Sequence, residues 1–276
     1  MNAFVINNKL KRIYTEQLPI PVQKDSDMFF GVQDEDIPVG VAAIRAEGSS
    51  FFLTYIFIRE EYRHRGAGTL LMDSVKSLLR EIGADSLEAT YTLNDSTAIL
   101  HDFLEEMQMG DEPGCEMPVM EFRLGDIPDS YRGKSPKNII SLQEVSNTAW
   151  GKYMTEYQKY RDETSEPMPD FREKDYYDPG LSFVCLDDQH KITGSILFSG
   201  TDNDRTLEHL ACIQPNSTSV IRALIFAAIN KADSFMDKDA LIKFCAFDSK
   251  TLSLADTICG GQVRQIGVSM TQIFEF

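Results

Sequence analysis

Two halves of the 276-residue chain carry the same succession of apolar segments, and this repetition is the strongest constraint on its fold. In the first half a hairpin pattern precedes the strand pattern FFLTYIFI, a helical pattern and the strand pattern SLEATYTL. In the second half the order is the same: ITGSILFS, RTLEHLACI, SVIRALIFAAINKADSF and ALIKFCAF. The spacings agree, since Gly40 to Ile58 is 18 positions and Gly194 to Ile213 is 19. The pattern predicts one fold used twice, with a chance agreement between α/β domains as the alternative.

A polar segment with several prolines and glycines, residues 125–138, separates the halves and is typical of a linker. We therefore expect a first domain at 1–125, a linker at 126–138 and a second domain at 139–276. A strand, a crossover helix and a further strand after a hairpin predict a mixed sheet. The expected fold class is α/β (α+β), with a mixed, largely antiparallel sheet flanked by helices in each domain. The last segment, QVRQIGVSMTQIFEF, is expected to form a closing hairpin.

The chain is acidic, with 27 Lys and Arg against 43 Asp and Glu and a formal net charge of −16. Its overall field repels phosphate backbones and anionic membranes, so we expect neither nucleic acid nor a membrane as a partner. Five scattered cysteines without a CxxC pair predict reduced thiols and a cytoplasmic location. We expect that none of the four histidines has a second His, Cys or carboxylate at the spacing that a metal site needs, so no metal is expected.

The turn RHRGAG, Arg63 to Gly68, connects FFLTYIFI to the helical pattern TLLMDSVKSLLREI. A helix leaves its first backbone N–H groups without partners and carries partial positive charge at that end, which favours an anion. Gly66 and Gly68 have no Cβ atom, so phosphate oxygens can approach the amides of residues 64–69. Arg63 and Arg65 add local positive charge. The turn predicts a diphosphate site, and the alternative is a plain surface connection with solvated arginines.

The longer string IFIREEYRHRGAGTLLM resembles the acetyl-CoA signature of the GNAT N-acetyltransferases. Tyr62 and Arg63 match its tyrosine–arginine pair and the two glycines match as well, whereas Glu60 stands where the family commonly has proline. The motifs cover residues 39–109, and the order of elements extends the resemblance over 1–125. The resemblance implies acetyl-CoA as co-substrate, and its diphosphate would be held by Arg63, His64, Arg65, Gly66, Ala67, Gly68 and Thr69.

The resemblance also places the pantetheine arm of acetyl-CoA. It implies that the backbone of Phe57 and Ile58 meets this arm as though the arm were an added strand. Asn94 matches a family asparagine near the same arm. A plain helix cap is the alternative role for Asn94, and the two roles are compatible.

The base for acetyl transfer is less clear from the sequence. An alkylamine has a pKa near 10.4 and must lose a proton before it attacks the thioester. Many family members use a glutamate on the strand before the loop, but Phe52 and Thr54 stand at the matching positions. Other relatives use a glutamate on the following strand, which makes Glu88 the candidate base. A solvated strand carboxylate is the alternative.

The acid for the leaving thiolate departs from the family pattern as well. The family's tyrosine on the next helix falls on His101 or on Leu104, depending on the end from which residues are counted. His101 is therefore the candidate acid, and a surface histidine is the alternative. Tyr55 and Tyr91 are further aromatic candidates, for which core packing is the default explanation.

The second half has neither arginine nor glycine in the matching turn, QPNSTSV. Ser217, Thr218 and Ser219 are expected only to cap the helix that follows. The resemblance thus implies a degenerate GNAT-like domain that walls off the acceptor cleft, packs against the first domain or forms a homodimer. The segment 151–178 either lines that cleft or is an amphipathic helix followed by a loop.

The expected function is an acetyl-CoA-dependent N-acetyltransferase, in which a primary amine attacks the thioester directly. The acidic chain is compatible with a small cationic acceptor or a peptide amine. The alternative is a non-catalytic acyl-CoA-binding or interaction module, because the family's strand glutamate and helix tyrosine are missing. Transfer of a longer acyl group is a third possibility.

Overall fold

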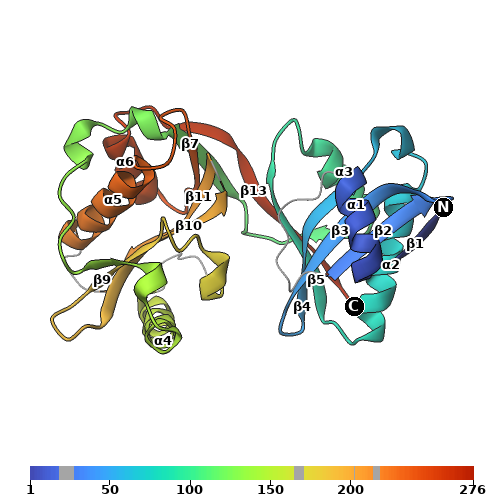
Figure 1. The fold of residues 1–276 in the computed structure, drawn as a ribbon, viewed down its shortest axis with the longest axis horizontal. Coiled ribbons are helices and arrows are strands. Elements are labelled where there is room, and N and C mark those ends of the chain that lie inside the picture. Colours follow the sequence, from blue (N-terminus) through green and yellow to red (C-terminus); the bar gives the residue numbers. More distant parts are fainter. Residues whose placement is uncertain (19–27, 165–170, 202, 214–217) are drawn as a thin grey trace. The chain divides into compact units, whose positions relative to one another are not determined.

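The computed structural model describes residues 1–276 except 19–27, 165–170, 202 and 214–217. The chain forms two compact units, Met1–Glu116 with Val268–Phe276 and residues 117–267 (Figure 1). These bounds differ from the expected ones at both ends of the second half. The strand after residue 116 is part of the second unit, and the last residues of the chain return to the first.

The first unit contains a mixed sheet of strand order β1-β2-β3-β4-β5-β13, in which β6 also pairs with β13. Only β4 and β5 are parallel, and the other neighbours are antiparallel. The elements are β1 Asn2–Val5, α1 Asn8–Gln17, β2 Met28–Asp34, β3 Ile37–Glu47, β4 Ser50–Ile58, α2 Ala67–Glu81, β5 Ser86–Leu93, α3 Ala98–Glu106 and β6 Gly110–Asp111, with β13 Arg264–Glu275 at the chain end. Strands β1 and β6 and helix α1 are additional to the elements expected from the sequence.

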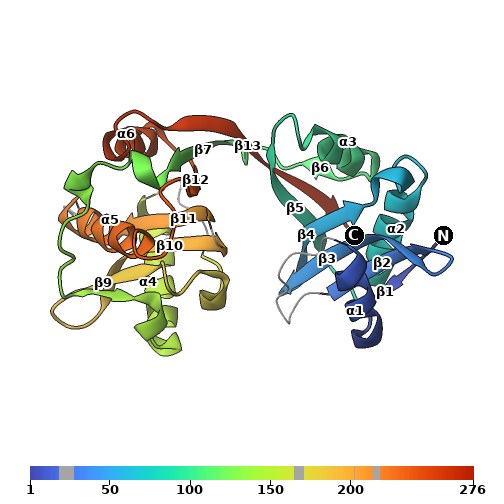
Figure 2. The same cartoon turned by 45° about the horizontal axis from the view of Figure 1, so that its top comes forward.

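Helices cover both faces of this sheet (Figure 2). On one face, Leu71 and Val75 of α2 and Leu104 of α3 are fully buried against the sheet. On the other, Tyr14 of α1 packs in a smaller cluster with Val41. Side chains alternate between faces along a strand, so the apolar strands of this unit serve two cores.

The second unit has the strand order β7-β12-β11-β10-β9-β8. Its elements are β7 Met117–Arg123, β8 Ile139–Ser141, α4 Asn147–Thr164, β9 Phe183–Leu186, β10 Ile192–Thr201, β11 Asp204–Cys212, α5 Thr218–Ala232, β12 Leu241–Cys245 and α6 Ser249–Ile258. One core lies between the sheet and α5, and another includes the buried Trp150 and Tyr153 of α4. The cap expected from Ser217 lies outside the described residues. None of the described helices is long and apolar enough to cross a membrane.

The strand register supports the internal repeat. Gly40 of β3 lies opposite Ile58 of β4, and a β-bulge follows between Ala43 and Ile44. Gly194 of β10 lies opposite Cys212 of β11, and a bulge follows at the same interval, between Leu197 and Phe198. The equivalent of Ile58 is thus Cys212 rather than Ile213. Bulges are specific features of a sheet, so their common position supports one architecture used twice.

The expected closing hairpin is wrong, because β13 is one continuous strand. Its last residues pair antiparallel with β5, from Val268 opposite Leu93 to Glu275 opposite Ser86. Gly267 lies within β13 and is not among the glycines of positive φ, so the strand does not turn there. Extended backbone throughout lets this strand complete the sheet of the first unit.

The segment 126–138 is not a free linker. Ile127 is buried in the core of the second unit, and Tyr131 packs edge-on against Phe226 of α5. Arg132 donates a hydrogen bond through Nε to Oδ2 of Asp233 at 2.7 Å, and its guanidinium also bonds backbone carbonyls of the same unit. Polar composition suggested a loop, but a few apolar anchors and one ion pair fix it to the domain.

We expect Arg132→Ala to destabilise the second unit by about 1–3 kcal/mol, because the Asp233 carboxylate and two carbonyls lose a donor. Burial acts to raise the pKa of Asp233, but hydrogen bonds from Arg132 and Lys238 lower it overall. This stabilisation is present above the ordinary Asp pKa of about 3.9 and is lost as the pH falls further. Thermal unfolding should therefore show a difference at pH 7 that shrinks near pH 3. Lys134→Ala, an exposed change in the same segment, is the control, and equal stability of both variants at pH 7 would contradict the expectation.

Candidate functional site

The turn before α2 exposes backbone amides. Gly66 is the N-cap of α2 with φ of 82°, and His64 also has a positive φ of 56°. A Cβ atom at Gly66 would meet no atom within 4 Å, so the space beside this residue is open. Among the described residues none accepts a hydrogen bond from the amides of 64–69. The first turn of a helix leaves such amides for an external anion.

Gly68 has a different role from Gly66. A Cβ atom at this position would lie 3.0 Å from Cε2 of Phe103, a residue of α3. The absence of a side chain therefore lets α3 pack against the first turn of α2. The amide-bearing turn and α3 are thereby held next to each other.

Arg63, His64 and Arg65 are exposed on the turn. The Nε atom of Arg63 donates a hydrogen bond to the carbonyl oxygen of Ile58 at 3.1 Å, which holds the start of the turn against the end of β4. Arg65 adds a second exposed guanidinium beside the free amides. Positive charge and hydrogen-bond donors thus lie together on the residues that are predicted to hold a diphosphate.

Strands β4 and β5 separate next to this turn. Their parallel pairing spans only Ser50 to Phe52 on β4, and Phe52 lies opposite Glu88. Among the described residues no strand pairs with this edge of β4 beyond Phe52, although β4 runs on to Ile58. The open edge can accept an extended ligand in the manner of an added strand.

The two residues expected at this edge differ in orientation. The Arg59 amide donates to the Val39 carbonyl of β3, and backbone groups of a strand alternate in direction. Phe57 therefore directs its backbone groups toward β3, as Arg59 does. Ile58 directs its own toward the open edge, where its carbonyl accepts from Arg63. Of the two residues, Ile58 offers its backbone groups at the open edge, and a role of either residue beside a pantetheine arm stays a prediction.

Asn94 follows β5 and shapes the start of α3. Its side-chain oxygen accepts hydrogen bonds from the amide and hydroxyl of Ser96 at 2.9 and 2.6 Å. Its backbone carbonyl accepts from the amides of Thr97 and Ala98. Thr97, not Asn94, is the N-cap of α3, so Asn94 orders the turn before the helix rather than capping it, and a role beside the cofactor stays a prediction.

Glu88 lies where β4 and β5 are still paired. It is half-buried, and one of its carboxylate oxygens accepts a hydrogen bond from the Ser86 hydroxyl at 3.1 Å. Tyr91, three positions further, contacts the core that contains α2 and α3. Residues three apart on a strand face opposite sides, so Glu88 lies on the other face of the sheet from Tyr91.

His101 forms a hydrogen-bonded cluster with Tyr91. The Tyr91 hydroxyl lies 2.7 Å from Nδ1 of His101 and donates to Oε1 of Gln272 at 2.9 Å. Gln272 comes from β13 and is fully buried. Because the Tyr91 hydroxyl donates its single proton to Gln272, its oxygen can only accept from His101. The Nδ1 atom of His101 is then the donor in their contact. Leu104, the alternative position for the family tyrosine, is buried in the core and can serve only in packing.

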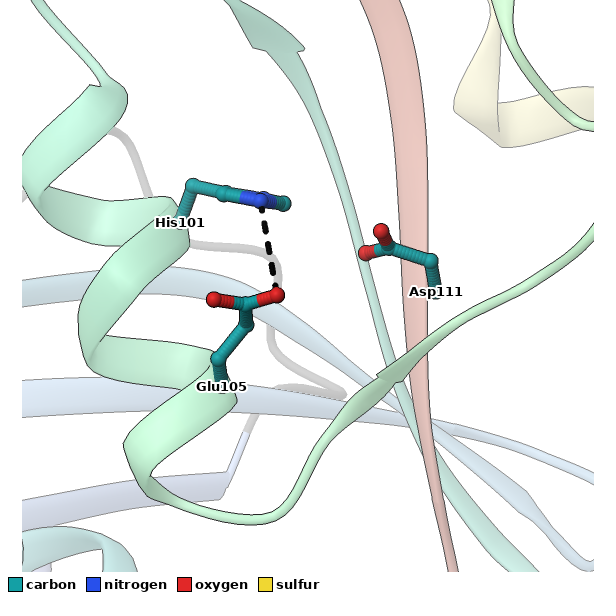
Figure 3. Close-up of side chains that lie close together, drawn as sticks. All are labelled: His101, Glu105 and Asp111. Atoms are coloured by element: carbon teal, nitrogen blue, oxygen red, sulfur yellow. Dashed lines mark ion pairs between the residues drawn. The ribbon is translucent and has the colours of Figure 1, made fainter.

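Carboxylates surround this cluster. Oε1 of Glu105 lies 3.8 Å from Nε2 of His101, and Asp111 faces both residues (Figure 3). Burial, together with the charges of Asp111, Glu105 and Asp102, raises the pKa of Tyr91 to about 12. The phenol is therefore protonated throughout the physiological range.

The same residues have the composition of a metal-binding set. One ligand atom each from His101, Glu105 and Asp111 lies within 4.8 Å of the others. The signal in the sequence is the spacing of four between His101 and Glu105, which places both on one helix face and runs against the expectation that no histidine has a second ligand at such a spacing. Exposed acidic groups commonly gather without an ion, so the absence of a metal stays a prediction.

Comparison with known proteins identifies the first half. Residues 6–107 match the family model described as Acetyltransferase (GNAT) family. This segment is similar to the GNAT acetyltransferases. No curated protein matches it in sequence.

Solved structures show that the GNAT architecture extends over the whole chain. A tandem GNAT protein from the clavulanic acid biosynthesis pathway is similar with a TM-score of 0.62 at 9% identity, over 92% of this chain and 84% of that one. A GCN5-related N-acetyltransferase from Sphaerobacter thermophilus gives 0.56 at 13%, over 97% and 84%. A GCN5-related glucosamine N-acetyltransferase region of a fungal multi-domain GH3 β-N-acetylglucosaminidase gives 0.62 at 13%, over 99% of this chain and 38% of that chain. At these identities the likeness shows a tandem GNAT fold.

Within this GNAT fold, the sequence located the turn with free amides before α2 but not the cluster around His101. Tyr91 was one of two aromatic candidates, and only its bond to His101 separates it from Tyr55. Nothing in the sequence pattern pointed to Gln272 as a partner of Tyr91, because the two residues are 181 positions apart. Periodicity cannot reveal a partner at that distance.

Proposed function

We propose that the first unit is an acetyl-CoA-dependent N-acetyltransferase that acetylates a primary amine. The observation that carries this proposal is the free amino end of α2 beside the open edge of β4. Together they provide amides for a diphosphate and a strand edge for an extended arm. The acceptor is a small cationic amine or a peptide amine.

The residues of the turn fit acetyl-CoA. The open space at Gly66 and the free amides of residues 64–69 match a diphosphate, and Arg63 and Arg65 supply charge. The open edge at Ile58 suits the amide groups of the pantetheine arm. When bound, acetyl-CoA supplies the activated acetyl group.

We assign proton donation to Tyr91, with His101 as its partner. Attack by the amine breaks the carbon–sulfur bond and leaves a thiolate, which takes a proton from the Tyr91 hydroxyl. His101 then returns a proton to the phenol oxygen through Nδ1, at 2.7 Å, while its Nε2 takes a proton from solvent water. Tyr91 of β5 thus takes the role that the resemblance assigns to a tyrosine on α3. Glu88, on the opposite face of the sheet, is proposed as the base that receives the amine proton, directly or through water.

Release of free CoA tests this proposal. We expect thiol release from acetyl-CoA when polyamines, aminoglycosides or peptide amines are added, and mass spectrometry should show the acetylated amine. The rival function is an acyl-CoA-binding module. Calorimetric binding of acetyl-CoA without thiol release from any amine would favour that module. Longer acyl-CoA substrates, compared at equal concentration, test the acyl-chain preference.

A further inference from the structure

The second unit contains a cavity where its own parallel strands separate. Pairing between β11 and β12 ends with Leu207 opposite Phe244. Strand β11 continues to Cys212, whereas β12 ends at Cys245. A cavity of about 280 Å³ lies at this separation, and residues of α5 and α6 also line it. It occupies the place in the second repeat that the open edge of β4 occupies in the first.

Most of the cavity wall is apolar. Its aliphatic and aromatic side chains come from the sheet, α5 and α6, and include Phe198, Leu210, Phe244, Ile225, Ile229 and Ile258. Water in such a space finds few hydrogen-bond partners, and the lining side chains lose dispersion contacts while it is unfilled. An apolar cavity of about 150 Å³ takes up benzene, so this one has room for roughly ten carbon atoms. An apolar chain of that size is favoured over water.

Glu208 lies at a β-bulge beside this cavity. The residues of β11 that pair with β10 on either side of it are His209 and Leu207, so Glu208 is the extra residue of the bulge. It is also one of the residues that line the cavity. At the equivalent bulge of the first repeat the extra residue is Thr54. A bulge changes the direction of a side chain, and here it places a carboxylate at the edge of an apolar space.

One oxygen of the Glu208 carboxylate has no donor in the described part of the chain. The hydroxyls of Tyr176 and Ser199 both donate to Oε1, the first at 3.1 Å. Among the described residues no group donates to Oε2, and no cation forms an ion pair with this carboxylate. Two neutral hydroxyls hold the carboxylate in place but leave its charge without a counterpart. An ammonium group would supply both the donor and the opposite charge.

The other ionisable side chains of the wall leave no second charge to be matched. Asp248 accepts hydrogen bonds from the amide and hydroxyl of Thr251, both at 2.8 Å, and these bonds, together with the charge of Lys250, lower its pKa. Lys250 lines the cavity too, so this pair compensates itself. Burial lowers the pKa of His209 to about 3, which keeps its ring neutral. Glu208 therefore gives the wall a net negative charge, which favours a cation over an anion.

We propose that this cavity binds a primary aliphatic amine in its protonated form, with the ammonium group at Glu208 and the chain among the apolar side chains. All residues of the site lie in the second unit, so the inference does not rest on acetyl transfer by the first. The second repeat, on this proposal, lacks the glycine turn and has kept a ligand site between its separated strands.

Calorimetry and thermal unfolding of the full chain with octylamine and butylamine test the apolar part of the site. Both amines are protonated at pH 7, because an alkylamine has a pKa near 10.4. We expect octylamine to bind at least about tenfold more tightly than butylamine, since each buried methylene adds to the affinity. Octylamine should also raise the melting temperature, because it binds the folded state. Equal affinity for the two amines would overturn the proposal.

The charged end is tested with ligands of equal chain length. Octylamine should bind more tightly than 1-octanol, and octanoate should bind least. Glu208→Gln should remove the preference for the amine over the alcohol. Asp188→Asn, which removes an exposed carboxylate outside the wall, should leave that preference intact. Equal affinity for amine and alcohol in the unaltered protein, or an undiminished preference in Glu208→Gln, would overturn the assignment of an ammonium group.

Changes on α6 locate the site, which matters because the first unit is itself proposed to take amines. Ala255→Leu adds bulk at the cavity wall and should abolish octylamine binding, whereas Ser253→Leu, at an exposed position outside the wall, should leave it unchanged. Octylamine binding retained in Ala255→Leu would place the ligand elsewhere. If Ala255→Leu fails to fold, Leu254→Lys adds a positive charge at a wall position that is already 38% exposed, and it should weaken binding. Unchanged binding in that variant would equally overturn the site.

Acetyl-CoA affinity separates this proposal from the proposed enzyme activity. Measured in every variant of the second unit, it should stay unchanged, because the turn before α2 is not altered. Loss of octylamine binding with acetyl-CoA affinity retained supports the second site. A parallel loss of both ligands would show a general effect on the fold and would overturn the assignment of these residues to an amine site.

Discussion

Gly66→Val is expected to raise the Kd for acetyl-CoA about a hundredfold or more. Valine at φ of 82° is strained, so the turn must change its backbone and misplace the amides that would face the diphosphate. Hydrogen bonds to charged groups contribute about 1.5–3 kcal/mol each, and loss of one or two of them gives this change. Isothermal titration calorimetry with acetyl-CoA measures it directly.

Gly83→Val is a matched control for this change. Gly83 follows the other end of α2, has φ of 75°, and also has open space where a Cβ atom would lie. The substitution therefore introduces similar strain on the same helix without touching the amino end. Unchanged affinity in Gly66→Val, or an equal loss in Gly83→Val, would remove the diphosphate from the proposed turn.

Tyr91→Phe is expected to lower kcat by about 10²- to 10⁴-fold, the usual contribution of a positioned acid. The KM for acetyl-CoA should change little, because the ring and the turn before α2 are retained. The unaltered enzyme should show no loss of rate from ionisation of Tyr91 below about pH 11, since the pKa of this phenol is raised to about 12. Steady-state kinetics over pH 6–10 test both expectations.

Tyr14→Phe provides the comparison for Tyr91→Phe. Burial also raises the pKa of Tyr14 to about 12, but its hydroxyl has no hydrogen-bond partner among the described residues. Its removal should leave kcat unchanged. An undiminished kcat in Tyr91→Phe, with stability confirmed by thermal unfolding, would exclude Tyr91 as the acid. An equal decrease in both variants would show a general effect of removing a buried phenol.

The sequence alone predicted the local elements of this protein well. The strands on each side of RHRGAG, the helix after it and the glycine at its N-cap are all present, because hydrophobic periodicity and glycine conformation act over a few residues. The repeat was visible for the same reason. Gly40 and Gly194 mark equivalent positions in two copies of one pattern.

Long-range pairing was decided only by the tertiary structure. Residues 117–123 join the sheet of the second unit, and the end of β13 completes that of the first, although the sequence placed each with the nearer half. An extended strand offers the same backbone donors and acceptors to any free edge. Its own residues therefore do not determine with which strand it pairs.

The candidate acid illustrates the same limit. The sequence supplied His101 and Tyr91 as separate possibilities, and the fold joined them to Gln272 from the far end of the chain. What the sequence by itself determined is where most helices and strands and the glycine turn before α2 lie, since these depend on neighbouring residues. The tertiary structure decided which strand completes which sheet and which side chains share a proton. Those contacts join residues that are remote along the chain.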